Sequence, residues 1–127
     1  MMKQLIYGIV ILSGLATVGT LNSCKKNNPS SAKIFIRSAD NVLLSDARVV
    51  LIADIQSNES DIEFVDTLFT NGDGYVEFNI ADYFEQAGKE IEVANFDLIA
   101  NKNDKLGIGE IRTRVYTTAV ETVYLEE

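Results

Sequence analysis

Short runs of β-branched and aromatic residues, separated by turn-forming residues about every ten positions, most strongly constrain how this chain folds. The clearest example follows Asn71-Gly72-Asp73-Gly74, where Val76, Phe78 and Ile80 alternate with other residues. Asn-Gly and Asp-Gly sequences tolerate the positive φ angles that tight hairpins require. Alternation with period two directly after such a turn predicts a β-hairpin with one buried face.

The same pattern extends over residues 32–127 and predicts an all-β domain. We expect strands at 33–37, 48–53, 62–69, 75–80, 91–100, 106–116 and 118–125, with one helical turn at 82–87. Seven short strands at this spacing favour a seven-stranded Greek-key β-sandwich.

Two motifs in this region resemble the transthyretin-like or carboxypeptidase-regulatory-like sandwiches. The segment from Asp46 to Leu51 is similar to the Gly-Ala-x-Val-x-Leu strand of that family, and Thr70 to Phe78 to its Thr-x-x-x-Gly-x-Phe-x-Phe hairpin. The resemblance spans about residues 33–125 and implies the sandwich of that family. Another immunoglobulin-like topology is the alternative. A shared fold implies no shared activity.

Residues 1–23 have the pattern of a secretory signal peptide. The basic residue Lys3 precedes an uncharged stretch from Leu5 to Leu21, which ends in small and polar residues. As a membrane-spanning helix this stretch is marginal, because about 20 apolar residues are needed and three glycines weaken it. We therefore expect a cleaved signal, with an uncleaved N-terminal anchor as the alternative.

The end of this segment, Leu21-Asn22-Ser23-Cys24, resembles the lipobox of bacterial lipoproteins. In that family the Cys thiol receives a diacylglycerol, the signal is removed, and the new N-terminus is usually acylated as well. The resemblance implies a lipid anchor at Cys24 in a bacterial, Bacteroidetes-type cell envelope. Two or three acyl chains hold a protein firmly, because each buried CH₂ contributes about 0.8 kcal/mol. A lone, idle thiol is the alternative.

Residues 24–31 are polar and contain the only Pro of the chain, which predicts a flexible tether between lipid and domain. Lys25 and Lys26 lie where they can contact anionic headgroups, or they are simply solvated. These lysines differ from the acidic surface-export signals of some Bacteroidetes lipoproteins. We therefore expect an outer-membrane protein that faces the periplasm, with surface exposure left open.

Composition excludes several functions. The net charge is −8, with 19 acidic and 11 basic residues, so the chain repels nucleic-acid backbones. The chain has no His and one Cys, which removes the commonest general base and any internal disulfide. We expect a non-catalytic protein without a cofactor.

A calcium site is also disfavoured. When Gly74 is set at the sixth position of a twelve-residue calcium loop, Phe69 and Ile80 occupy the first and last positions, where carboxylates are required. Turn formation explains the oxygen-rich residues 71–74 equally well, and it also explains Asn101, Asn103 and Asp104. We expect no metal site.

The remaining candidates are aromatic residues beside loops. Tyr83, Phe84 and Tyr116 belong either to the core or to an exposed binding surface, and Leu43-Leu44 is similarly ambiguous. We expect a structural or protein-interaction module that binds an unidentified envelope protein. A carbohydrate-binding or adhesion module and an enzyme accessory domain are the alternatives. Exposed, coplanar rings would favour carbohydrate, whereas an unpaired strand edge would favour protein.

Overall fold

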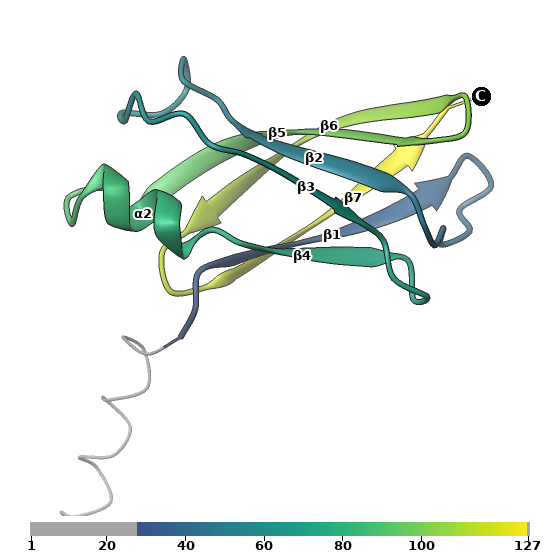
Figure 1. Ribbon diagram of the computed structural model, residues 1–127, viewed down its shortest axis with the longest axis horizontal. Helices are drawn as coiled ribbons and strands as arrows, with labels where there is room; N and C mark the ends of the chain where they lie inside the picture. The colour runs from purple at the N-terminus through teal and green to yellow at the C-terminus, as the bar shows by residue number, and fades with distance from the viewer. Residues whose placement is uncertain (1–27, 127) are drawn as a thin grey trace, which may run out of the picture.

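A computed structural model describes residues 28–126, which form seven strands and one short helix (Figure 1). The elements are β1 (Ser31–Ser38), β2 (Arg48–Ala53), β3 (Val65–Phe69), β4 (Tyr75–Asn79), α2 (Ala81–Ala87), β5 (Val93–Lys102), β6 (Lys105–Arg114) and β7 (Thr118–Leu125).

The strands form two sheets. One has the order β4-β1-β7 and the other has the order β3-β2-β5-β6. β1 pairs in parallel with β7 and antiparallel with β4, whereas all pairs in the four-stranded sheet are antiparallel. The predicted all-β class and the seven strands are confirmed.

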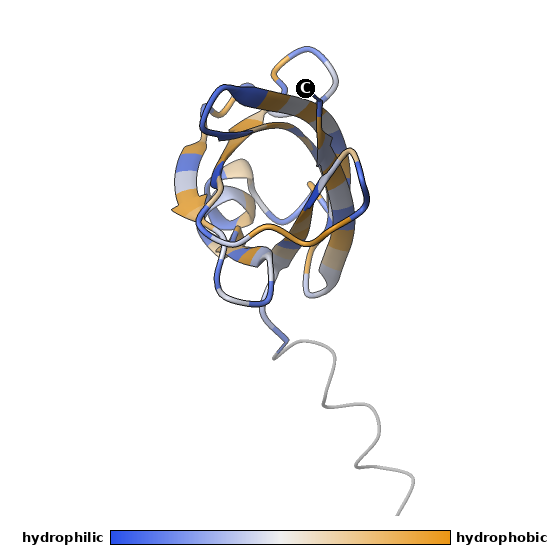
Figure 2. Ribbon diagram, turned by 90° about the vertical axis from the view of Figure 1, so that its right-hand side faces the viewer, coloured by the Kyte–Doolittle hydropathy of each residue, from blue (hydrophilic) through white to orange (hydrophobic). Residues whose placement is uncertain are grey.

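The core lies between the two sheets, and alternate residues of each strand point into it. Ile34 and Ile36 of β1 are fully buried, and so are Phe96 and Leu98 of β5. Apolar and polar bands alternate along the strands when the molecule is viewed from its end (Figure 2). Burial of these alternate apolar side chains is the main force that holds the sheets together.

The two sheets meet along one side, between β6 and β7. There the backbone N–H of Glu126 donates to the carbonyl of Leu106 at 3.0 Å. Gly107 lies so close to β7 that a Cβ atom at this position would overlap the Tyr124 carbonyl oxygen. On the other side, β3 and β4 are successive strands of different sheets and do not pair with each other.

The domain begins earlier than the sequence indicated. Ser30 and Ser31, which we expected in the tether, are buried, and Ser31 is the first residue of β1. The Ser30 carbonyl accepts the N–H of Ile80 at 3.0 Å, and its hydroxyl accepts the N–H of Tyr116 at 2.7 Å. These hydrogen bonds fix Ser30 to the fold.

Candidate interaction surface

The outer edge of β3 has unpaired backbone groups. Thr70 N–H donates to the Ala47 carbonyl and Ala53 N–H to the Phe64 carbonyl, both at 2.9 Å. Hydrogen-bonded pairs alternate along an antiparallel ladder, so the even-numbered residues of β3 face β2. The residues whose backbone N–H and C=O groups point away from the sheet are Val65, Thr67 and Phe69.

The side chains of this edge are largely apolar and exposed. Val65 is 65% exposed and Phe69 is 60% exposed. Asp66 is the single charged residue of β3, and its Oδ1 accepts the outward N–H of Thr67 at 2.8 Å. Natural sheet edges are usually protected by charges, Pro or bulges. Within β3 itself, the edge is protected only by the Asp66 carboxylate, which is bonded to the Thr67 N–H.

The neighbouring edge of β4 is protected more fully. Tyr75 N–H donates to Asn71 Oδ1 at 3.2 Å, and the Tyr75 carbonyl accepts the N–H of Asn71 at 3.0 Å. Glu77, the next residue with outward backbone groups, exposes a charged side chain. The turn and the charge together leave β4 less suited than β3 to pair with another strand.

An apolar stripe continues from β3 across the outer face of the four-stranded sheet. Thr67 lies beside Val50, Val50 beside Ile99, and Ile99 beside Ile108. Ile108 is 74% exposed. The β3 edge is therefore continuous with one row of apolar side chains on this sheet face.

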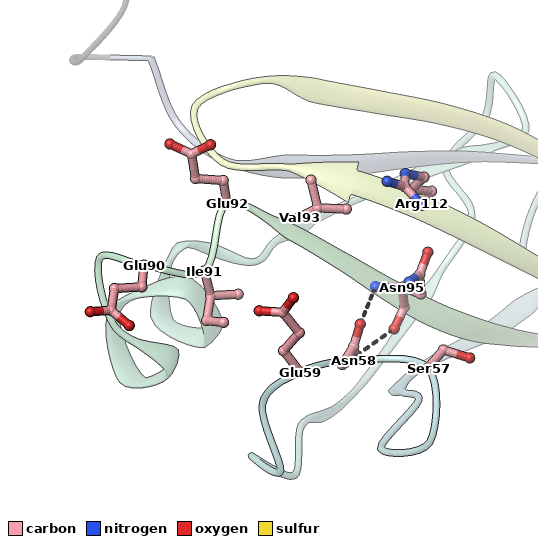
Figure 3. Close-up of a pocket in the computed structure, with 9 residues that line it drawn as sticks. All are labelled: Ser57, Asn58, Glu59, Glu90, Ile91, Glu92, Val93, Asn95 and Arg112. Atoms are coloured by element: carbon pink, nitrogen blue, oxygen red, sulfur yellow. Dashed lines mark hydrogen bonds between the residues drawn. The ribbon is translucent and has the colours of Figure 1, made fainter.

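A hollow of about 310 Å³ lies near the start of β5 (Figure 3). On one side, Asn95 N–H donates to Asn58 Oδ1 at 2.7 Å, and Asn58 Nδ2 donates to the Asn95 carbonyl at 2.9 Å. The carboxylates of Glu59, Glu90 and Glu92 and the guanidinium of Arg112 also line it. Asn58 thus holds the loop 54–64 against β5.

The start of the same loop is an Asx turn. The carboxylate of Asp54 accepts the Ser57 hydroxyl and the Gln56 N–H. The Ser57 hydrogen bond is the main cause that lowers the pKa of Asp54 below its usual value. This carboxylate therefore serves to order the turn.

Within residues 28–126 no group of three or more His, Cys, Asp or Glu side chains is placed to hold a metal ion. The oxygen of Asn71 accepts the N–H groups of Asp73 and Tyr75, as expected for a turn. In the same part of the chain, no helix has the length and hydropathy needed to cross a membrane.

The three aromatic residues that the sequence singled out lie in two different environments. Tyr116 is exposed, in the turn between β6 and β7. Tyr83 and Phe84 belong to the core and not to a binding surface, which were the two alternatives that the sequence left open. Both are buried, and the Tyr83 ring contacts Phe96 edge-on, with centroids 5.2 Å apart. Cys24 and the rest of the lipobox, Leu21, Asn22 and Ser23, lie outside the described residues.

A sequence signal could have identified this burial. Ile80, Tyr83, Phe84 and Ala87 have the i, i+3, i+4, i+7 spacing of an apolar helix face. In the structure α2 turns this face toward the end of the core, where Tyr83 and Phe84 pack edge-on at 5.6 Å.

Other aromatic rings lie on the outer face of the three-stranded sheet. Phe35 and Tyr75 have centroids 5.5 Å apart, but their planes are tilted by 54°. The ammonium group of Lys33 lies 4.3 Å from the Tyr75 centroid, which is a cation–π contact. These two rings do not form the coplanar platform that would indicate a sugar site.

No protein-family model matches the chain, and no curated protein sequence matches it either.

Proposed function

We propose that this chain is a lipoprotein of a bacterial cell envelope that presents a non-catalytic β-sandwich as a protein-interaction module. The observation that carries the proposal is the open edge of β3. Its outward backbone groups and exposed apolar side chains provide what an added strand requires, namely hydrogen-bonding partners and apolar contacts on alternate residues. Val65 and Phe69 flank this edge at its two ends.

We also propose a transthyretin-like Greek-key topology for the sandwich. In support, β2 and β3 are antiparallel neighbours, β4 crosses to the other sheet, and β5 returns through α2 to pair with β2. The segment 46–51 that resembles the family lies at β2, and the second motif, 70–78, connects the two sheets.

The anchor in this proposal is the acylated Cys24. With Ser30 fixed to the domain, the tether is residues 24–29, which span at most about 20 Å when extended. A short tether of this kind keeps the domain close to the bilayer, in our proposal the outer membrane, on its periplasmic side. Protein docking is preferred to carbohydrate binding because the rings of Phe35 and Tyr75 are tilted and the Lys33 ammonium lies over both of them.

The test is the intact mass of the protein extracted from its native membranes. We expect the mass of residues 24–127 plus acyl chains, and we expect the protein to remain in the membrane fraction. The matched control is Cys24→Ala, which removes the acyl acceptor and is expected to lose the acyl mass. A wild-type chain with a free Cys24 thiol in the soluble fraction would contradict the proposal.

A further inference from the structure

We infer that the partner at the β3 edge is a second copy of this chain, paired with it antiparallel about a two-fold axis at Thr67. This inference rests on the proposed role of β3 as a protein-interaction edge and names its partner. The two four-stranded sheets would then join, β3 to β3, into one continuous sheet.

The backbone of β3 is symmetric in the required way. The outward groups belong to Val65, Thr67 and Phe69, which are evenly spaced around the central residue. When Thr67 lies opposite Thr67 of the second copy, Val65 lies opposite Phe69 at both ends. All three pairs are then hydrogen-bonded pairs, because each has its N–H and C=O groups directed across the new interface.

The side chains are self-complementary in the same register. Val65 meets an aromatic ring, and Thr67 meets another Thr, both of which are favourable cross-strand pairs. On the other face of the strand, Asp66 lies opposite Leu68 of the second copy. The two carboxylates are therefore not directly opposed, and the strongest repulsion that such an edge could have is avoided.

The other edges of the described sandwich are less available. The β4 edge is occupied at Tyr75 by the turn and carries the exposed Glu77. β6 and β7 lie against each other, as the hydrogen bond from Glu126 to Leu106 shows. Among residues 28–126, β3 is therefore the edge where a second copy has the most unpaired backbone to bind.

The hydrogen bond from Thr67 N–H to Asp66 Oδ1 competes with this pairing. A five-residue strand with a competing carboxylate makes a weak interface in dilute solution. Confinement to a membrane raises the effective concentration of the edge, as any tether does. The pairing is accordingly expected in the membrane-bound protein, and removal of the competing carboxylate is expected to strengthen it.

The test uses single Cys substitutions in the full chain, in its native membranes, followed by mild oxidation and a non-reducing gel. Thr67→Cys is expected to form a disulfide-linked dimer, because paired Cα atoms about 5.5 Å apart fit disulfide geometry. Val65→Cys and Phe69→Cys are the matched controls. In either one alone the two thiols are separated by about 13 Å along the strands. We expect neither to exceed wild type, whereas co-expression of the two variants is expected to give the dimer.

A second measurement does not depend on a disulfide. Thr67→Pro removes the central outward N–H but no hydrogen bond to β2, so the β2–β3 ladder remains intact. We expect chemical cross-linking of the membrane-bound protein to lose its dimer band while the melting temperature stays close to that of wild type. Glu77→Pro removes the equivalent outward N–H from β4 and is expected to keep the dimer.

Asp66→Ala removes the acceptor that competes for the Thr67 N–H and is expected to increase the Thr67→Cys dimer. Asp66→Asn retains an acceptor oxygen, so we expect it to increase the dimer less than Asp66→Ala does.

Either of two results would overturn the inference: Thr67→Cys no better linked than wild type, or Val65→Cys and Phe69→Cys each linked as strongly as Thr67→Cys. The intact mass of the wild-type chain, measured in the same membranes, reports separately on the anchor. A free Cys24 with the register-specific dimer intact would refute the lipid anchor and keep the edge pairing. An acylated Cys24 without that dimer would refute the pairing alone.

Discussion

At the scale of single residues, Thr70 connects the start of the β3–β4 hairpin to the segment 44–47. The Thr70 hydroxyl accepts the N–H of Ala47 at 2.8 Å and donates to the carbonyl of Leu44 at 2.7 Å. The backbone carbonyl of Thr70 also accepts the N–H of Asp46 at 3.0 Å. The side chain is buried, so these polar groups have little access to water. This arrangement explains why a Thr stands at the start of the hairpin motif.

Thr70→Val is therefore expected to lower the free energy of unfolding by about 1–3 kcal/mol, because a buried donor and acceptor lose their partner. Thr70→Ser is the matched control, since it keeps the hydroxyl and removes one methyl group. Urea denaturation of both variants measures the difference. Equal destabilisation by Val and Ser would show that the hydroxyl is not the stabilising group.

Tyr83 has a buried hydroxyl that makes no hydrogen bond within residues 28–126. Burial raises the pKa of this phenol, and the nearby Ser60 hydroxyl offsets the effect only in part. Because the pKa of Tyr83 is higher in the folded than in the unfolded state, ionisation of this phenol takes no stability from the fold below about pH 10. The free energy of unfolding then falls as the pH rises through the folded-state pKa.

Tyr83→Phe should thus be neutral or stabilising at pH 7, because it removes a buried polar group without a partner. It should also reduce the loss of stability between about pH 10 and 11. Urea denaturation at both pH values tests this, with Tyr124→Phe as the control for an exposed phenol. A large loss of stability at pH 7 would reveal a hydrogen bond to Tyr83.

At the scale of elements, the hairpin between β3 and β4 depends on one of its two glycines. Gly74 has a φ of 82°, and a Cβ atom there would lie 2.7 Å from the Cβ of Leu43. Gly72 has no heavy atom within 4 Å of an added Cβ. We expect Gly74→Ala to cost about 2–4 kcal/mol through strain and overpacking. Gly72→Ala should change stability by less than about 1 kcal/mol. Thermal denaturation of the two variants measures the difference. Similar losses of stability in both would contradict the dependence of the hairpin on Gly74.

The elements also show how far the sequence predicts this fold. Strands 48–53 and 118–125 have the bounds expected, because period-two patterns and turn residues are local signals. The sequence leaves the burial of Tyr83 open, because this residue lies beside loops, although the spacing of its apolar neighbours is helical. The free edge of β3 was not predictable, because which strands pair depends on contacts between distant segments, such as the parallel pairing of β1 with β7.

At the scale of the whole molecule, the point where the chain enters the domain determines how a tethered sandwich is oriented. The start of β1 lies at the end of the sandwich that carries α2 (Figure 1). Ser30 is bonded there to Tyr116, whose side chain is 48% exposed. The turn after β5, at residues 103–104, lies at the opposite end, about 30 Å away along the ten residues of β6. In a lipoprotein anchored at Cys24, Tyr116 would lie near the bilayer surface and the β5–β6 turn away from it.

The chain contains no Trp, so one introduced Trp reports this orientation without background. We expect the fluorescence of Tyr116→Trp, in vesicles carrying the lipidated protein, to be quenched by spin-labelled headgroups. Asp104→Trp, in the exposed turn at the far end, should be quenched several-fold less, because a separation of about 30 Å exceeds the range of contact quenching. Tyr116→Trp keeps an aromatic ring at the same position, and Tyr and Trp both favour membrane interfaces. Equal quenching of the two would mean that the sandwich lies along the bilayer, and stronger quenching of Asp104→Trp would mean that its far end faces the membrane.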